Sequence, residues 1–459
     1  MRTLSRLTAL GVALTTALTS IVGGISHAPA AAAAQPLDVT EALVNTPRNI
    51  VGDYAGFYQH PNKYPRKPGR VIRTQDFFKF LTLPKGEKPT YPLRGTRVMY
   101  TSTTSTGRVV PTTGAILEPT SRWVGKGETP LIVLAPGTLG QGSQCAASKT
   151  IGSVIAVSRT QDKQNISTIL NYETVGVLQL LAAGYRVFVV DYIGGNTGPQ
   201  SYVNNIEAGH VMLDAARAAT RMNRTTTRTP VGFWGYSQGG AASALGTTLH
   251  KTYAPEVNLK AAYVGAAPLD LIKVNKTIDG TRITAAALYG VNGFAARFPA
   301  VKKYVNSVVT PTGKEVLERV SQECVMDSIR STGYLRSKTL TKDGRALYEH
   351  MRDNPTMRRI MDEQLAAAHK TPSVPVLVLS NPHDDIVPYA QVWTANRKWC
   401  SQGAKTTFIR FVFKDEAVGN GKAHLRPGTK GVAYGLDFMF KAFNGSTPTK
   451  CSVKTVVHQ

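Results

Sequence analysis

The chain has 459 residues, of which 42% are hydrophobic and 18% are charged, and its formal net charge is +25. This composition allows a large buried core and excludes an intrinsically disordered chain. The basic residues are scattered and follow no basic–aromatic pattern or nucleic-acid-binding module, which argues against a nucleic acid as partner.

The N-terminus has the features of a secretory signal peptide over residues 1–34. A basic start with Arg2 and Arg6 is followed by an apolar run over 7–24 and then by small residues up to Gln35. Polar residues interrupt the apolar run, so we expect cleavage near Gln35 rather than a retained membrane anchor. The leader holds two arginines and no acidic residue, so its removal lowers the net charge from +25 to +23. We expect a secreted or envelope-associated protein, a monomer, whose basic surface suits anionic lipid or envelope surfaces.

Strands and helices alternate after an irregular beginning. Residues 35–90 are rich in Pro, Lys and Gly without clear periodicity, which indicates an N-terminal arm with one short helix. Beyond it, apolar runs and three- to four-residue periodicity predict a hairpin over 98–103 and 114–118, strands at 131–134 and 186–191, and helices at 174–183 and 208–222.

The most informative segment is Gly235-Tyr236-Ser237-Gln238-Gly239. It follows the apolar run 231–234 and leads into a small-residue helical segment that begins at Gly240. A strand that breaks into Gly-x-Ser-x-Gly and enters a helix is typical of a nucleophile elbow, in which a sharp turn lifts the serine hydroxyl clear of the sheet. Ser237 is therefore the predicted nucleophile.

The strand–helix rhythm stops over residues 269–370, which show helical patterns and no strong strand. Alternating elements favour an α/β fold with a mostly parallel sheet that carries helices on both faces. We interpret 269–370 as a helical cap inserted between two parts of the core, 91–268 and 371–459. The other elements expected after the elbow are strands at 260–264, 374–379 and 406–413 and helices at 390–398 and 431–443.

A serine nucleophile needs a base and an acid that orients the base, and in doubly wound hydrolases these follow in the order Ser, acid, His. The acid lies just past the strand 374–379, in a segment that holds both Asp384 and Asp385. We prefer Asp384 for its position two residues before the Ile-Val-Pro segment, and interpret Asp385 as an exposed loop charge. His424 follows the next strand and is the predicted base, whereas His383 lies on the wrong loop for that order.

The tetrahedral intermediate of an acyl transfer needs two backbone N–H donors, the oxyanion hole. One is expected from Gln238, the residue after the nucleophile. The other is expected from the glycine-containing loop after the strand 131–134, either Gly137 or Thr138. No metal-ligand spacing, phosphate-cradling loop or dinucleotide fingerprint is present, so neither a metal nor a cofactor is expected.

The chain has four cysteines without a CxxC pair: Cys145, Cys324, Cys400 and Cys451. In an exported protein this number predicts two disulfides rather than a zinc site. The sequence alone leaves three connectivities open.

These residues together resemble the secretory lipase family of α/β-hydrolases. The resemblance extends over about 40–445 and rests on the elbow, on Ala135-Pro136-Gly137-Thr138 and on the segments around Asp384 and His424. It implies an α/β-hydrolase fold, a catalytic triad of Ser237, Asp384 and His424, and a lid at 269–370 over an acyl tunnel. It also implies a disulfide between Cys145 and Cys324, which leaves Cys400 to pair with Cys451.

The expected activity is that of a secreted carboxylic ester hydrolase, a lipase acting on lipid esters such as acylglycerols. Six aliphatic or aromatic cap residues would suit an acyl chain or would form the core of the cap: Leu288, Val291, Phe294, Phe298, Leu335 and Leu340. The alternatives are an acyltransferase that uses envelope lipid or sugar alcohols, a serine peptidase, and a non-catalytic basic envelope-binding protein.

Overall fold

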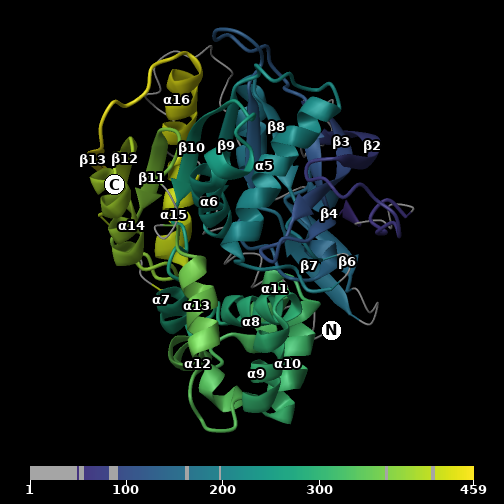
Figure 1. Ribbon diagram of the computed structural model, residues 1–459, viewed down its shortest axis with the longest axis vertical. Helices are drawn as coiled ribbons and strands as arrows, with labels where there is room; N and C mark the ends of the chain where they lie inside the picture. The colour runs from purple at the N-terminus through teal and green to yellow at the C-terminus, as the bar shows by residue number, and fades with distance from the viewer. Residues whose placement is uncertain are drawn as a thin grey trace, which may run out of the picture.

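A computed structural model gives the structure of the protein (Figure 1). It describes residues 49–50, 56–81, 91–160, 165–195, 198–366, 371–414 and 419–458. The predicted signal peptide, 1–34, lies outside the described residues.

A sheet of ten strands forms the centre of the described part, in the order β13-β12-β11-β10-β9-β5-β8-β4-β3-β2. The strands from β13 to β8 are parallel, while β2, β3 and β4 are antiparallel to their neighbours. The bounds are β2 Val71–Leu81, β3 Tyr91–Thr103, β4 Val109–Leu117, β5 Leu131–Ala135, β8 Arg186–Val190, β9 Val231–Tyr236, β10 Leu259–Gly265, β11 Val376–Ser380, β12 Thr406–Phe413 and β13 Ser452–His458.

The central strands β5, β9 and β11 are buried along their whole length. A strand covered on both faces needs a continuous apolar run rather than alternation, and these three segments have one. This burial confirms the expected fold class, in which helices cover a mostly parallel sheet on both sides.

Helices α5 (Asn205–Arg221), α6 (Gln238–Tyr253) and α14 (Tyr389–Ser401) contribute buried residues to one core cluster. Helices α4 (Glu173–Ala182) and α16 (Val432–Phe443) contribute to a second cluster, which also contains Trp234 and Tyr263. The rings of Trp234 and Tyr263 stack with 4.3 Å between their centroids. Because side chains alternate across the sheet, the two clusters lie on its opposite faces.

The expected helical insertion lies between β10 and β11 and gathers at one end of the molecule (Figure 1). Three of its helices begin with a proline. Proline is favoured at the first helical position because the N–H that it lacks would have no acceptor within the helix. We call α7 to α13 the cap. Its helices are α7 Leu271–Ile278, α8 Ala285–Arg297, α9 Pro299–Val308, α10 Pro311–Ser321, α11 Val325–Thr332, α12 Leu347–Asp353 and α13 Pro355–Glu363.

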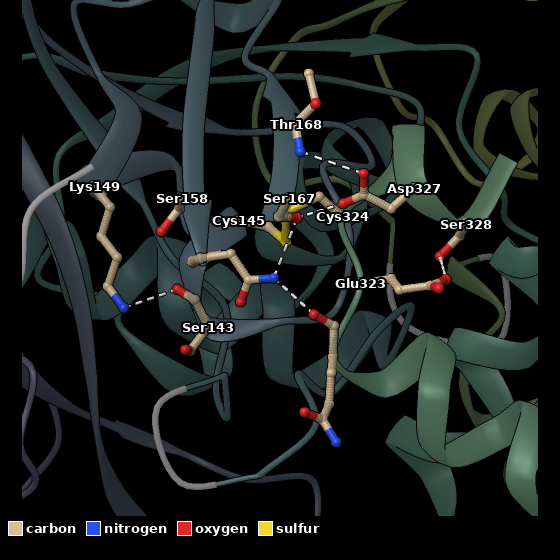
Figure 2. Close-up of a disulfide and its surroundings, with 12 residues drawn as sticks. Ser143, Cys145, Lys149, Ser158, Ser167, Thr168, Glu323, Cys324, Asp327 and Ser328 are labelled. Atoms are coloured by element: carbon tan, nitrogen blue, oxygen red, sulfur yellow. Dashed lines mark hydrogen bonds between the residues drawn. A yellow bond between two sulfur atoms is a disulfide. The ribbon is translucent and has the colours of Figure 1, made fainter. Parts of the chain in front are cut away.

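A disulfide joins Cys145, in the loop after β5, to Cys324, which directly precedes α11 of the cap. Figure 2 shows this bond with Asp327 beside it, whose carboxylate accepts hydrogen bonds from the Ser167 hydroxyl and, at 3.3 Å, from the Thr168 N–H. The second disulfide, between Cys400 and Cys451, anchors the strand β13. The structure therefore has the pairing that the family resemblance implies.

Three parts of the fold differ from the expectation. The described residues 56–81 of the expected arm contain the strand β2 and no helix. A separate three-stranded sheet of β1 (Asn49–Ile50), β6 (Ile155–Arg159) and β7 (Ile166–Leu170), and the last strand β13, were not expected. Helix α15 (Lys422–Lys430), which carries His424, was not among the expected helices, because Gly428 and Pro427 mask its helical pattern. Within the described residues no helix is both long and apolar enough to cross a bilayer.

Candidate active site

Ser237 lies on the turn between β9 and α6, in a backbone conformation with φ 54° and ψ −123°. A positive φ in a residue other than glycine is strained and persists only where the surroundings impose it. Its N–H is fixed by a 2.9 Å hydrogen bond to the carbonyl oxygen of Gly265, at the end of β10. The structure therefore has the sharp strand–turn–helix geometry that the pentapeptide predicts.

The glycines two residues before and two residues after the serine leave no room for a side chain. A Cβ atom added to Gly235 would lie 2.0 Å from the carbonyl oxygen of Gly239, and one added to Gly239 would lie 2.0 Å from that of Ala135. These contacts are far inside van der Waals distance and involve backbone atoms that cannot turn away. No side chain therefore fits at either position of the turn.

Asp384 and His424 lie side by side although 40 residues separate them in sequence. The His424 Nδ1 atom is 2.8 Å and 3.0 Å from the two carboxylate oxygens of Asp384, and both side chains are buried. Asp384 Oδ1 also accepts the N–H groups of Ile386 and Val387. A carboxylate held this firmly fixes the ring orientation of the histidine and directs its Nε2 atom away from the acid.

Asp385 is not the exposed loop charge that we expected. Its Oδ2 atom accepts the N–H groups of Gly419 at 2.8 Å and Gly421 at 2.9 Å, and its Oδ1 atom accepts the His424 N–H at 3.1 Å. The half-buried carboxylate thus holds the loop that leads into α15 and satisfies an N–H of its first turn. No sequence pattern could have indicated this role, since the three donors are backbone groups far along the chain.

Tyr236 is a further residue that sequence reasoning missed. Its hydroxyl donates to the backbone carbonyl of His424, and its ring lies 5.4 Å from the imidazole between centroids. This contact brings the His424 ring beside the residue that directly precedes Ser237. Ser237 thus follows a residue at the end of β9 that contacts His424 in the first turn of α15, and His424 in turn pairs with Asp384 in the loop after β11.

The expected oxyanion donors differ in what they contact. Gln238 is the first residue of α6, where the helix leaves its N–H without an intrahelical acceptor. The N–H of Gly137, by contrast, donates to Glu173 Oε1 at 2.8 Å, so it is already engaged. Of the two alternatives on this loop, Thr138 is therefore the better candidate, and its hydroxyl lies 2.6 Å from that of Tyr202.

The six cap residues considered for an acyl chain lie mainly in a packed core. Four of them are at most 2% exposed and belong to the cluster that joins the cap to α5 and α6: Leu288, Val291, Phe294 and Leu340. Phe298 and Leu335 pack against the same cluster. These residues therefore have a structural role in this structure.

Residues 160–451 match the family model described as secretory lipase. Secreted triacylglycerol lipase LIP7 of Malassezia globosa is 29% identical over 309 residues, which cover 66% of this chain and 62% of that protein. The chain thus spans less than two thirds of this relative. A Mycobacterium tuberculosis protein named probable inactive lipase MT1628 is 25% identical over 384 residues, 82% of this chain and 80% of that protein.

Among solved structures, Candida antarctica lipase A in its closed state has a TM-score of 0.71 and 20% sequence identity. The similarity covers 86% of this chain and 87% of that chain, and shows that the two proteins share the α/β-hydrolase fold.

Proposed function

The chain belongs to the secretory lipase family, and on this basis we propose that it is an exported serine hydrolase that cleaves carboxylic esters of lipids, acylglycerols among them. The observation that carries the proposal is the strained Ser237 turn beside the buried hydrogen-bonded pair of Asp384 and His424. A strained backbone at a serine that follows the C-terminal end of a strand, close to an imidazole of fixed orientation, is typical of sites of nucleophilic catalysis.

In the proposed reaction the Ser237 Oγ attacks the ester carbonyl while His424 Nε2 takes its proton. The tetrahedral intermediate collapses to an acyl-enzyme, and the imidazolium returns the proton to the departing alcohol. Water then attacks the acyl-enzyme with His424 again as base, which releases the carboxylic acid and restores Ser237. Asp384 keeps the Nδ1–H of His424 in place and stabilises the imidazolium.

The proposed oxyanion hole consists of the N–H groups of Gln238 and Thr138. The first lies at the N-terminus of α6, a 16-residue helix whose dipole favours the negative charge that forms on the substrate oxygen. The second belongs to the loop after β5, whose Pro136 carbonyl oxygen would lie 3.1 Å from a Cβ atom added to Gly239 of the elbow.

The cap is proposed to act as the lid of the acyl-binding side. The contacts that restrict its movement include the disulfide before α11 and an ion pair between Arg297 of α8 and the buried Glu207 of α5, with Nη2 3.0 Å from Oε2. Any opening therefore has to leave α8 and the start of α11 in place.

The decisive test measures hydrolysis of p-nitrophenyl esters of increasing chain length by the wild type and by Ser237→Ala. We expect the substitution to abolish activity and to prevent labelling by a fluorophosphonate. Ser243→Ala, a buried serine in the helix that follows Ser237, is the matched control and should retain both. A folded wild-type protein that neither hydrolyses esters nor takes the label would refute the proposal, and an active Ser237→Ala would refute this site.

A further inference from the structure

The peptide group between Pro136 and Gly137, in the loop that carries the proposed Thr138 donor, is held at both edges. The Tyr192 hydroxyl donates to the Pro136 carbonyl at 2.6 Å, and the Gly137 N–H donates to Glu173 Oε1 at 2.8 Å. Because a peptide group is planar, two hydrogen bonds at its opposite edges fix its orientation. The next peptide group is the one that carries the Thr138 N–H.

The start of α4 lies directly against this loop. A Cβ atom added to Gly137 would lie 2.1 Å from the Tyr172 hydroxyl oxygen, and that hydroxyl is 3.5 Å from the Thr138 carbonyl. Tyr172 is the N-cap residue of α4 and Glu173 is its first residue. The loop and the helix start therefore fit each other closely, and Glu173 is the acceptor on which this fit depends.

The environment of Glu173 disfavours the charged form of this acceptor. Its side chain is buried, and this burial raises its pKa from 4.5 to about 7, although the Gly137 N–H acts in the opposite direction. The groups whose charges interact with it are the hydroxyls of Tyr172, Tyr192 and Tyr263, whose own pKa values are raised by burial first and by Glu173 as well. These tyrosines are neutral near pH 7, so no cation offsets the carboxylate among them.

We infer that Glu173 is a positioning residue of the proposed oxyanion hole, which holds the Pro136–Gly137 peptide and thereby sets the direction of the Thr138 N–H. The inference rests on the proposed function. Its productive form is the neutral acid, since a carboxylate in the same buried region would repel the negative charge that develops on the substrate oxygen. The acid then accepts the Gly137 N–H through its carbonyl oxygen.

The test uses Glu173→Gln, which keeps an acceptor oxygen and cannot ionise, and Glu173→Ala, which removes the acceptor. Hydrolysis of p-nitrophenyl butyrate, a soluble ester, gives kcat and KM from pH 5 to 9. We expect Glu173→Ala to lower kcat at least tenfold with KM within threefold, because an oxyanion hole acts mainly on the transition state. We expect the kcat of the wild type to decline above pH 7, and Glu173→Gln to keep kcat within threefold at pH 6 and to lack that decline.

Val177→Ala on the same helix is the matched control, since this buried residue belongs to the hydrophobic core and has no side-chain acceptor for the Gly137 N–H. The inference is overturned if Glu173→Ala keeps wild-type kcat, if it loses no more than Val177→Ala, or if Glu173→Gln is as slow as Glu173→Ala. Should Glu173→Ala fail to fold, the pH profile decides: an unchanged decline in Glu173→Gln overturns the inference, and its absence supports it. An inactive Ser237→Ala with a fully active Glu173→Ala would refute this inference alone, not the proposed function.

Discussion

The buried carboxyl of Glu173 makes a prediction about stability that is independent of catalysis. Its pKa rises from 4.5 to about 7 on folding because burial disfavours the charged form. Between these two values the folded protein binds more protons than the unfolded chain, so the free energy of unfolding falls as pH increases. Each pKa unit corresponds to about 1.36 kcal/mol, so ionisation of Glu173 costs the folded protein roughly 3 kcal/mol once the pH exceeds 7.

Glu173→Gln removes this cost because an amide does not titrate in either state. We therefore expect the variant to gain stability relative to the wild type: the difference between their free energies of unfolding should rise by about 3 kcal/mol between pH 4 and pH 8. The buried Asp214, whose pKa burial raises to about 6, contributes to the pH dependence of both proteins and cancels in the difference.

The assay is urea unfolding of both proteins at pH 4, 5, 6, 7 and 8, with linear extrapolation to water. Glu315→Gln, on the exposed side of α10, is the control for removal of a carboxylate as such. If the difference between Glu173→Gln and the wild type is the same at pH 4 and pH 8, the carboxyl is not protonated on folding and the reasoning is refuted.

Three further predictions concern the site and its supports. Asp384→Asn should lower kcat about 10³-fold or more with the fold intact, whereas Asp385→Asn should mainly lower thermal stability. Equal losses of kcat in the two variants would contradict the different hydrogen bonds of the two carboxylates. Gly239→Ala should abolish activity, since its Cβ would lie 2.0 Å from a backbone oxygen; a fully active variant would contradict this geometry. Replacing the cysteines of the Cys145–Cys324 bond by alanine should lower the free energy of unfolding by roughly 3–5 kcal/mol, about 1 kcal/mol more than for Cys400–Cys451, because the sequence separations are 179 and 51. Denaturant unfolding of the two double variants measures both losses, and equal losses would contradict the difference in loop length.

Short-range patterns predicted the core of the fold well. The apolar runs that became β5, β9, β11 and β12 and the elbow before α6 were all expected from sequence. Each has a local cause, either a strand buried on both faces or a turn that admits only glycine. The strands β2 and β13 were missed because they are the two edge strands of the sheet, and edge strands have weaker patterns.

The candidate site was likewise predictable only in part. The sequence by itself determined which residue types could do the chemistry, since the order Ser237, acid, His424 follows from strand order in a doubly wound sheet. It could not distinguish the tasks of Asp384 and Asp385, because adjacent residues with the same side chain differ only in the direction in which the turn points them.

Only the tertiary structure decided which groups those carboxylates, Tyr236 and Glu173 contact. Asp384 faces the imidazole, Asp385 holds backbone N–H groups of the loop before α15, and Glu173 holds the Gly137 N–H. These are hydrogen bonds between a side chain and a distant backbone group, and a backbone donor is the same in every residue but proline. The sequence thus determined the fold class and the candidate reactive side chains, and packing between distant segments decided how each is held.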